Sequence, residues 1–123
     1  RDCFLRAKIY GADFDSRILF NEERINTFFV DQTRPITFEK ISEDIGNNFN
    51  LMIDDGLHSP NANLHSLRFF MNKLKIGGYG VIEDIHENHK EIWSTLTCLL
   101  PTNYHGALIK TNVAFVYIVK RLA

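Results

Sequence analysis

Residues 51–58 read LMIDDGLH, and the interpretation of the whole chain starts from this stretch. Apolar side chains run directly into two carboxylates, a glycine and a histidine, as in a buried strand that ends at a functional site. Ligands of open α/β sheets bind just beyond the carboxyl ends of the strands. A second stretch of this kind, VIEDIH, follows at residues 81–86. Two strands that end in acids are therefore expected to meet at one point.

The composition is that of one folded domain, with 45% hydrophobic and 12% aromatic residues in 123. A net charge of −1 with no basic run argues against binding to nucleic acid or to a membrane surface. No apolar stretch approaches the ~18 residues of a spanning helix, and there is no signal-peptide pattern. Cys3 and Cys98 are far apart in the sequence and are expected to be reduced thiols, so a cytoplasmic protein is predicted. The sequence leaves the oligomeric state open, homo-oligomers included.

Strand and helix patterns alternate along the chain. Strands are predicted at residues 7–12, 25–30, 49–53 and 79–82, and helices at 15–24, 35–45, 59–76 and 87–100. The second of these helices is expected to bury Phe38, Ile41 and Ile45, and the last one Ile92, Trp93, Leu96 and Leu99. Residues 107–119 read as two strands with a turn near 111–112, which predicts an antiparallel hairpin. The alternation predicts an α/β fold with a mostly parallel sheet and helices on both of its faces.

Four predicted strands end in acids, namely Asp13 and Asp15, Asp31, Asp54 and Asp55, and Glu83 and Asp84. One acid at a strand end is often only a helix cap. Four such ends at one edge raise each other's ionisation cost, which a bound divalent cation would relieve. Carboxylate oxygens without a Cys₂His₂ pattern indicate Mg²⁺ or a similar ion rather than structural zinc.

His58 follows the acid pair at the entrance to a predicted helix. A lone loop histidine is usually a surface residue. This one comes after a buried strand and a glycine, beside two acids, so a general base is the favoured interpretation. His86 is close enough to the acid edge to touch a substrate, whereas His65, His89 and His105 are expected to be solvated.

Five stretches together resemble the class I S-adenosylmethionine-dependent methyltransferases, and most closely the macrocin-type sugar O-methyltransferases. They are YGADFD at 10–15, VDQ at 30–32, IDDGLH at 53–58, LKIGGY at 74–79 and VIEDI at 81–85. Individually these stretches are weak signals, and their combination is fairly specific. The resemblance implies a Rossmann-like methyltransferase sheet with a C-terminal antiparallel hairpin, and a small-molecule acceptor that contains a sugar.

The resemblance also implies roles for individual residues. Asp13 would bind the cofactor ribose, Asp31 and Gln32 would lie beside the adenine, and Asp54 would be a nearby cofactor-site or structural carboxylate. Asp55, Glu83 and Asp84 would hold Mg²⁺, which lowers the pKa of the acceptor hydroxyl. His58 would remove the proton of that hydroxyl as it attacks the sulfonium methyl group.

The sequence departs from the family pattern in three places. Leu57 stands where serine is common, and Ile76 where proline is common. The first strand of the fold and its glycine-rich loop are absent. Residues 1–123 are therefore expected to be one partial domain, from the second strand to the hairpin. The missing strand would lie between the Asp13 and Asp55 strands, leaving unpaired backbone on both sides, and the isolated chain is expected to bind the cofactor poorly.

Two other interpretations remain open. Asp13-Phe14-Asp15 after a strand also resembles the paired aspartates of Mg²⁺-dependent haloacid-dehalogenase-like phosphatases. Arg17 stands where those enzymes prefer threonine or valine, and the hairpin would have no explanation. The third interpretation is a truncated methyltransferase-like module that binds a partner without catalysis.

Overall fold

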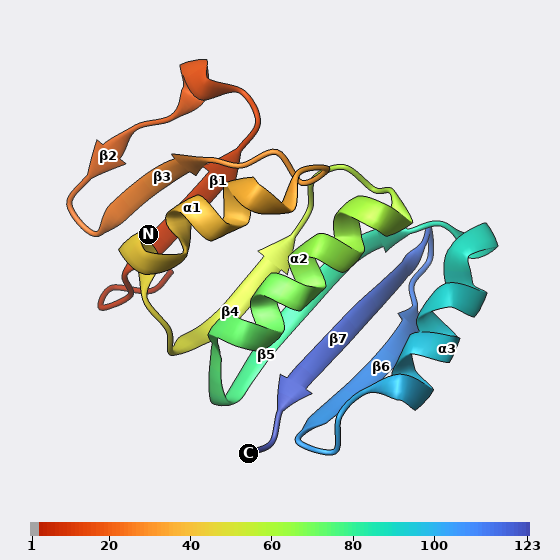
Figure 1. Ribbon diagram of the computed structural model, residues 1–123. Helices are drawn as coiled ribbons and strands as arrows, with labels where there is room; N and C mark the ends of the chain where they lie inside the picture. Colours follow the sequence, from red (N-terminus) through yellow and green to blue (C-terminus); the bar gives the residue numbers. More distant parts are fainter. Residues whose placement is uncertain (1–2) are drawn as a thin grey trace. The chain divides into compact units, whose positions relative to one another are not determined.

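The computed structural model describes residues 3–123, which divide into two compact units with the boundary along the chain between Ile45 and Gly46 (Figure 1). The first unit contains β1 (Ile9–Asp13), η1 (Ser16–Ile18), β2 (Asn21–Glu22), β3 (Ile25–Phe29) and α1 (Pro35–Ile45). The second contains β4 (Phe49–Asp54), α2 (Pro60–Lys73), β5 (Leu74–Ile85), η2 (Glu87–His89), α3 (Lys90–Leu99), β6 (Tyr104–Lys110) and β7 (Phe115–Arg121). That all of these form one domain stays a prediction.

The first unit has a three-stranded sheet in the order β1-β3-β2, with β1 and β3 parallel. The helix predicted at 15–24 is wrong. Its expected cap is present, because Asp15 accepts a hydrogen bond from the Arg17 amide, but only the single 3₁₀ turn η1 follows. Arg24 has a positive φ of 68° in the tight turn between β2 and β3. A left-handed residue is incompatible with a helix at this point, so the chain forms a short hairpin instead.

The second unit has a four-stranded sheet in the order β4-β5-β7-β6. β4 and β5 are parallel, and β7 runs antiparallel to both β5 and β6. The predicted C-terminal hairpin is thus confirmed, with Lys110 opposite Phe115 at its closed end. The mixed sheet, parallel first and antiparallel at the C-terminus, is the predicted Rossmann-like arrangement.

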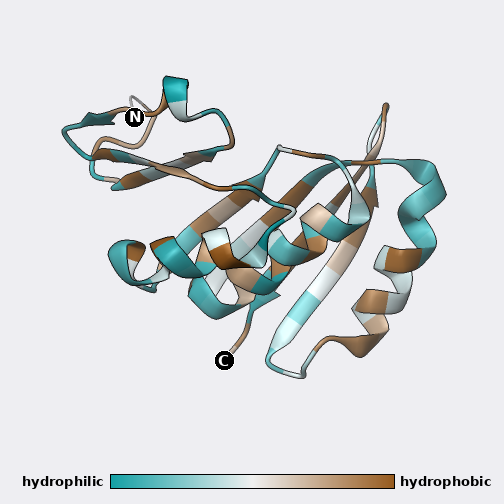
Figure 2. Cartoon of the chain, turned by 45° about the horizontal axis from the view of Figure 1, so that its top comes forward, coloured by the Kyte–Doolittle hydropathy of each residue, from teal (hydrophilic) through white to brown (hydrophobic). Residues whose placement is uncertain are grey.

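The core of the second unit lies on one face of this sheet. Buried residues of α2 and α3 pack there against β5 and β7, and the Trp93 ring lies 4.8 Å from that of Tyr117. In Figure 2 the helices are banded in brown and teal, as expected for helices with one buried side. Leu51, Ile53 and Tyr79 alternate with the core-facing residues and are 48%, 53% and 42% exposed. Within residues 46–123 both α-helices therefore lie on one face of this sheet, and helices on both faces of the whole predicted sheet stay a prediction.

The C-terminus of α2, at Lys73, lies three residues before the predicted end at residue 76. Leu74 is already extended, and the carbonyls around the helix end accept hydrogen bonds from outside the helix, from Arg121 and the Tyr104 hydroxyl among others. β5 therefore begins without a loop. Gly78 serves a close approach, since a Cβ there would lie 2.5 Å from the Phe49 carbonyl oxygen of β4.

The buried stripes of α1 and α3 differ in how well they were predicted. Phe38 and Ile45 of α1 are buried as expected, and Ile41 is half-buried. In α3, Trp93 is fully buried, but Ile92 and Leu99 are 41% and 74% exposed. The reason is that α3 packs through a narrower side, formed by Trp93, Leu96 and the following Leu100.

Strands β1 and β4 each stand at an edge of their own sheet. Within residues 3–123 each therefore has one side without a neighbouring strand. Among these residues no helix has the length and hydropathy needed to cross a bilayer. Cys3 and Cys98 are both exposed free thiols.

Candidate active site at the ends of β4 and β5

The parallel pairing of β4 with β5 brings two of the predicted acid-rich strand ends together. The paired residues run up to Asp54 opposite Ile82. Asp55 therefore follows β4 at the level where Glu83 and Asp84 occur on β5. This is the carboxyl edge at which open α/β sheets bind ligands.

A bulge in β5 turns Asp84 out of the regular strand. Between β5 and β7 the pairing passes from Ile82–Tyr117 to Ile85–Phe115, so β5 carries one extra residue. Asp84 itself has a positive φ of 51°. A bulge breaks the strict alternation of side chains and is a common device for re-aiming one of them at a site.

Asp55, His58 and Asp84 form a cluster in which one ligand atom of each lies within 4.8 Å of the other two. His58 Nε2 is 3.9 Å from Asp55 Oδ1 and also 3.9 Å from Asp84 Oδ2. Both distances exceed that of a hydrogen bond, so the imidazole lies between the carboxylates without being locked to either. All three side chains are open to solvent. Two carboxylates fit Mg²⁺, and an adjacent imidazole fits a proton acceptor.

The structure separates the cluster from two predicted neighbours. Glu83 is half-buried and is not part of the three-residue group found among residues 3–123. Asp54 is only 4% exposed. Its Oδ1 accepts a hydrogen bond from the Gly56 amide at 3.1 Å, and its Oδ2 accepts one from Asn63 Nδ2 at 3.0 Å. These are the contacts of a structural carboxylate.

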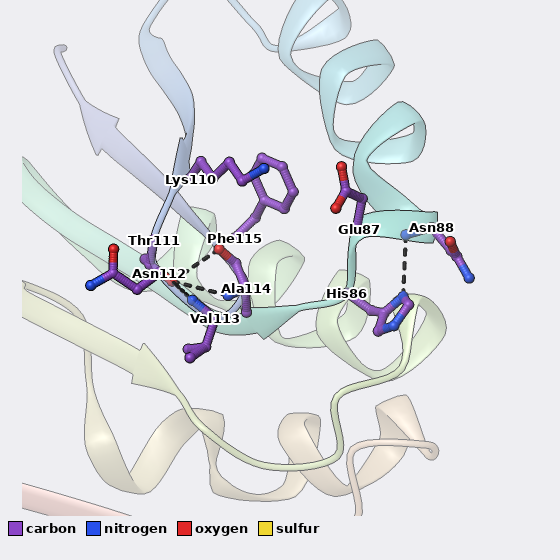
Figure 3. Close-up of a pocket in the computed structure, with 9 residues that line it drawn as sticks. All are labelled: His86, Glu87, Asn88, Lys110, Thr111, Asn112, Val113, Ala114 and Phe115. Carbon is purple, nitrogen blue, oxygen red and sulfur yellow. Dashed lines mark hydrogen bonds between the residues drawn. The ribbon is translucent and has the colours of Figure 1, made fainter.

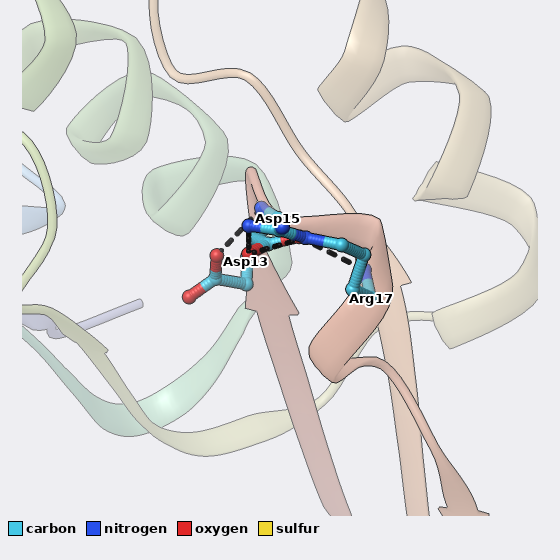
Figure 4. A network of polar contacts seen from close by, with 3 residues as sticks. All are labelled: Asp13, Asp15 and Arg17. Atoms are coloured by element: carbon cyan, nitrogen blue, oxygen red, sulfur yellow. Dashed lines mark hydrogen bonds and ion pairs between the residues drawn. The ribbon is translucent and has the colours of Figure 1, made fainter.

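The acids of the first unit are held by neighbours within two residues. Asp13 Oδ1 accepts a hydrogen bond from the Asp15 amide at 2.7 Å (Figure 4). Arg17 donates to both oxygens of Asp15, at 2.8 Å from Nε and 2.7 Å from Nη2. This side-chain contact lowers the pKa of Asp15 and raises the pKa of Arg17. Asp15 is therefore committed to a local ion pair, whereas the second oxygen of Asp13 points away from it.

Asp31 is held in a similar way just after β3. The hydroxyl of Thr33 donates to its Oδ1 at 2.6 Å, and the Thr33 amide donates to the same oxygen at 3.0 Å. The hydroxyl contact is the main reason that the pKa of Asp31 is lowered. Gln32 follows directly and is half-buried.

A hollow of about 500 Å³ lies where η2 faces the turn between β6 and β7 (Figure 3). His86, Glu87 and Asn88 form one wall, and the turn from Lys110 to Phe115 forms the other. His86 Nδ1 accepts a hydrogen bond from the Asn88 amide at 3.2 Å. On the other wall, the Lys110 ammonium lies 5.8 Å from the centre of the Phe115 ring. The hollow thus combines an aromatic ring with charged and polar groups.

Sequence reasoning missed both this hollow and the buried hydrogen bond of Asn63 to Asp54. The hollow joins segments more than twenty residues apart, and no local pattern signals that. For Asn63 a signal existed, because positions 63, 67, 70 and 74 have helical spacing and the last three are leucine or phenylalanine. A polar residue on a buried stripe needs a buried partner.

Comparison with known proteins gives curated relatives and structural neighbours, while no protein-family model matches. The chain is 28% identical over 86 residues to an 8-demethyl-8-alpha-L-rhamnosyl tetracenomycin-C 2'-O-methyltransferase of Streptomyces olivaceus, covering 70% of this chain and 22% of the relative. It is 33% identical over 82 residues to a demethylmacrocin O-methyltransferase of Streptomyces fradiae, covering 67% and 20%. The chain thus spans about a fifth of the length of these relatives.

Among solved structures, the chain resembles the MycE methyltransferase from the mycinamycin biosynthetic pathway, in complex with Mg, SAH and mycinamycin VI. The TM-score is 0.71 at 23% sequence identity, and the match covers 95% of this chain and 37% of MycE. An rRNA methylase from Streptococcus thermophilus matches with a TM-score of 0.63 at 15% identity, covering 94% and 74%. The Rossmann-like methyltransferase fold is confirmed, and so is the resemblance to the macrocin-type sugar O-methyltransferases.

Proposed function

We propose that this chain carries the acceptor-activating part of an S-adenosylmethionine-dependent, Mg²⁺-assisted O-methyltransferase that acts on a hydroxyl of a sugar or glycosylated small molecule. The observation that carries the proposal is the convergence of Asp55, His58 and Asp84 at the carboxyl ends of β4 and β5. The similarity to sugar O-methyltransferases, and to a methyltransferase solved with Mg and SAH, supports it.

In this proposal Asp55 and Asp84 hold the cation, with Glu83 as a further ligand taken from the family resemblance. Bound Mg²⁺ would supply a Lewis acid that lowers the pKa of the acceptor hydroxyl. His58 Nε2 accepts the hydroxyl proton, since no hydrogen bond among the described residues occupies it. Bound S-adenosylmethionine would supply the methyl group, which would pass to the acceptor oxygen as the carbon–sulfur bond breaks, with S-adenosylhomocysteine as the leaving product. Positioning and deprotonation are then the main demands on the protein.

The cofactor is assigned to the first unit by the resemblance. Asp13 is proposed for the ribose hydroxyls, and Asp31 and Gln32 for the adenine. Asp13 and Asp31 each engage one carboxylate oxygen locally, in the contacts to Asp15 and Thr33. Their second oxygens supply the acceptors that such roles need. Asp54 is the least supported cofactor residue, because its hydrogen bonds are internal to the second unit.

The acceptor is proposed to extend from the cluster into the hollow beside η2. His86 lies two residues beyond Asp84 and lines the hollow. A glycosylated molecule has both hydroxyl groups and apolar surface. The polar groups of the hollow can bind the hydroxyl groups, and the Phe115 ring can pack against the apolar surface.

The test uses the protein as its gene encodes it. Transfer of labelled methyl groups from S-adenosylmethionine to rhamnosyl and other deoxysugar glycosides is measured with and without Mg²⁺. We expect transfer that requires Mg²⁺ and falls by at least about a hundredfold in His58→Asn, the scale of general-base catalysis. His105→Asn is the matched control, since His105 is exposed on β6 and belongs neither to the cluster nor to the lining of the hollow.

A parallel assay with a generic phosphate ester and Mg²⁺ distinguishes the main alternative. Phosphate release that Asp13→Asn abolishes would support the phosphatase and overturn the methyltransferase proposal. If neither reaction occurs, the non-catalytic binding module is the reading that stands.

A further inference from the structure

We infer that Asn63 of α2 is a positioning residue for the candidate site, acting through the buried carboxylate of Asp54. The inference rests on the proposed function in that it assigns Asp55 and His58 the roles given above. Asn63 is only 2% exposed and Asp54 only 4%. Their side chains meet in a hydrogen bond of 3.0 Å between Asn63 Nδ2 and Asp54 Oδ2.

The pair closes the loop that carries the site residues. Asp54 is the last residue of β4, and Asn63 lies one turn inside α2, so their hydrogen bond spans residues 55–62. The other oxygen of Asp54 accepts from the Gly56 amide inside the same loop. Asp55 and His58 are thus mounted on a short segment anchored to a strand at one end and to a helix at the other.

The helix end of the loop is equally constrained. The Asn63 amide donates to the Ser59 carbonyl at 2.9 Å, and the Ser59 amide donates to the Leu57 carbonyl at 2.5 Å. Pro60 restricts the backbone at the first helical position. His58 therefore lies at the centre of a tight turn, and the buried hydrogen bond from Asn63 to Asp54 ties the start of this loop to α2.

Energetics favour a role in positioning over simple packing. A buried carboxylate is costly unless its oxygens are hydrogen-bonded, and Asn63 satisfies the oxygen that the loop does not. If Asn63 only filled space, an apolar residue of similar size would serve as well. Hydrogen-bond partners of metal ligands typically change metal affinity by about 10- to 100-fold when they are removed, and Asn63, which acts one residue further away through Asp54, is expected at the lower end of that range.

The test compares Asn63→Leu with the exchanged pair Asp54→Asn/Asn63→Asp. The exchange keeps the charge and shape of the pair and reverses the hydrogen bond, with the Gly56 amide still satisfied. Thr97→Val is the matched control, because it removes a polar contact between α3 and the Tyr117 hydroxyl of β7, away from the loop. Two readouts are taken on the metal-free and Mn²⁺-titrated protein: amide hydrogen exchange of residues 55–59, and Mn²⁺ affinity.

In Asn63→Leu we expect faster exchange of the Gly56 amide and about tenfold weaker Mn²⁺ binding. We expect both to return toward wild type in the exchanged pair and to stay unchanged in Thr97→Val. Unchanged exchange in residues 55–59 of Asn63→Leu would overturn the inference, as would equal effects in Thr97→Val. If the wild-type protein binds no Mn²⁺ while loop exchange still depends on Asn63, the metal role in the proposed function fails and the positioning role stands.

Discussion

The two sheets hold their strand-end acids in different ways. In the first unit, Asp13 and Asp31 are each bound by a residue two positions further along the chain. In the second unit, Asp55, His58 and Asp84 come from two strand ends about thirty residues apart. Local contacts need little tertiary structure, whereas the cluster exists only while β4 and β5 are paired and the α2 loop is anchored. The second unit should therefore couple its site to its core more strongly than the first.

The largest expected effect is a loss of stability in the core of the second unit. Trp93→Ala empties a fully buried position against Tyr117, and we expect a loss of about 3–5 kcal/mol in the free energy of unfolding, measured with urea. Phe14→Ala is the surface control in the first unit, where the ring is 68% exposed, and should change stability by less than about 0.5 kcal/mol. Similar losses in both variants would show that burial against Tyr117 does not account for the loss in Trp93→Ala.

The next prediction tests whether the acids at the ends of β4 and β5 bind one cation together. Asp84→Asn removes one carboxylate of the cluster, and we expect Mn²⁺ affinity to fall by about a hundredfold in a calorimetric titration. Asp31→Asn removes a strand-end acid of the first unit and should leave that affinity unchanged. If Mn²⁺ affinity falls in Asp31→Asn and not in Asp84→Asn, the cation binds among the acids of the first unit, which would contradict our proposal.

A smaller effect concerns how closely the sheets are packed. A Cβ at Gly106 would overlap the Tyr117 hydroxyl, so Gly106→Ala should cost about 1–3 kcal/mol of stability in thermal unfolding. A Cβ at Gly11 of the first sheet would lie 3.1 Å from a methyl group of Thr27, a tight contact that a small shift relieves, so Gly11→Ala should cost less than Gly106→Ala. Tyr117→Phe removes the overlapping oxygen and should recover part of the Gly106→Ala loss. No recovery in the double variant would contradict this account.

The smallest effect is a shift in the titration of Asp31. Thr33→Val removes the hydroxyl that lowers the pKa of this carboxyl, so its pKa should rise toward the ordinary value in an NMR titration. Because the folded pKa is lowered, the contact stabilises the fold above the unfolded pKa, and this contribution is lost as pH falls through the folded pKa. Thr33→Ser keeps the hydroxyl and should leave the pKa low. If the pKa of Asp31 stays low in Thr33→Val, the hydroxyl of Thr33 is not the cause, and the hydrogen bond from the Thr33 amide would explain the shift.

Errors of prediction occurred where local patterns gave no information on neighbours. Residues 16–24 have a good N-cap in Asp15, yet the left-handed Arg24 turns them into a hairpin against β3. Leu99 has helical spacing from Trp93 and Leu96, but α3 packs through too narrow a side to bury it. In each case the outcome depended on which surface the segment met, and a single segment does not encode that surface.

The amino-acid sequence by itself determined the strands that end in acids, the C-terminal hairpin and the residue types available for chemistry, since these follow from apolar runs, turn residues and side-chain pKa. Only the tertiary structure decided which acids act together. The parallel β4–β5 ladder and the bulge at Asp84 bring that carboxylate to Asp55 and His58. The buried hydrogen bond from Asn63 makes Asp54 a structural residue, whereas the neighbouring Asp55, with the same side chain, belongs to the cluster. Adjacent residues at a strand end face opposite ways, so their environments are set by what packs on each side.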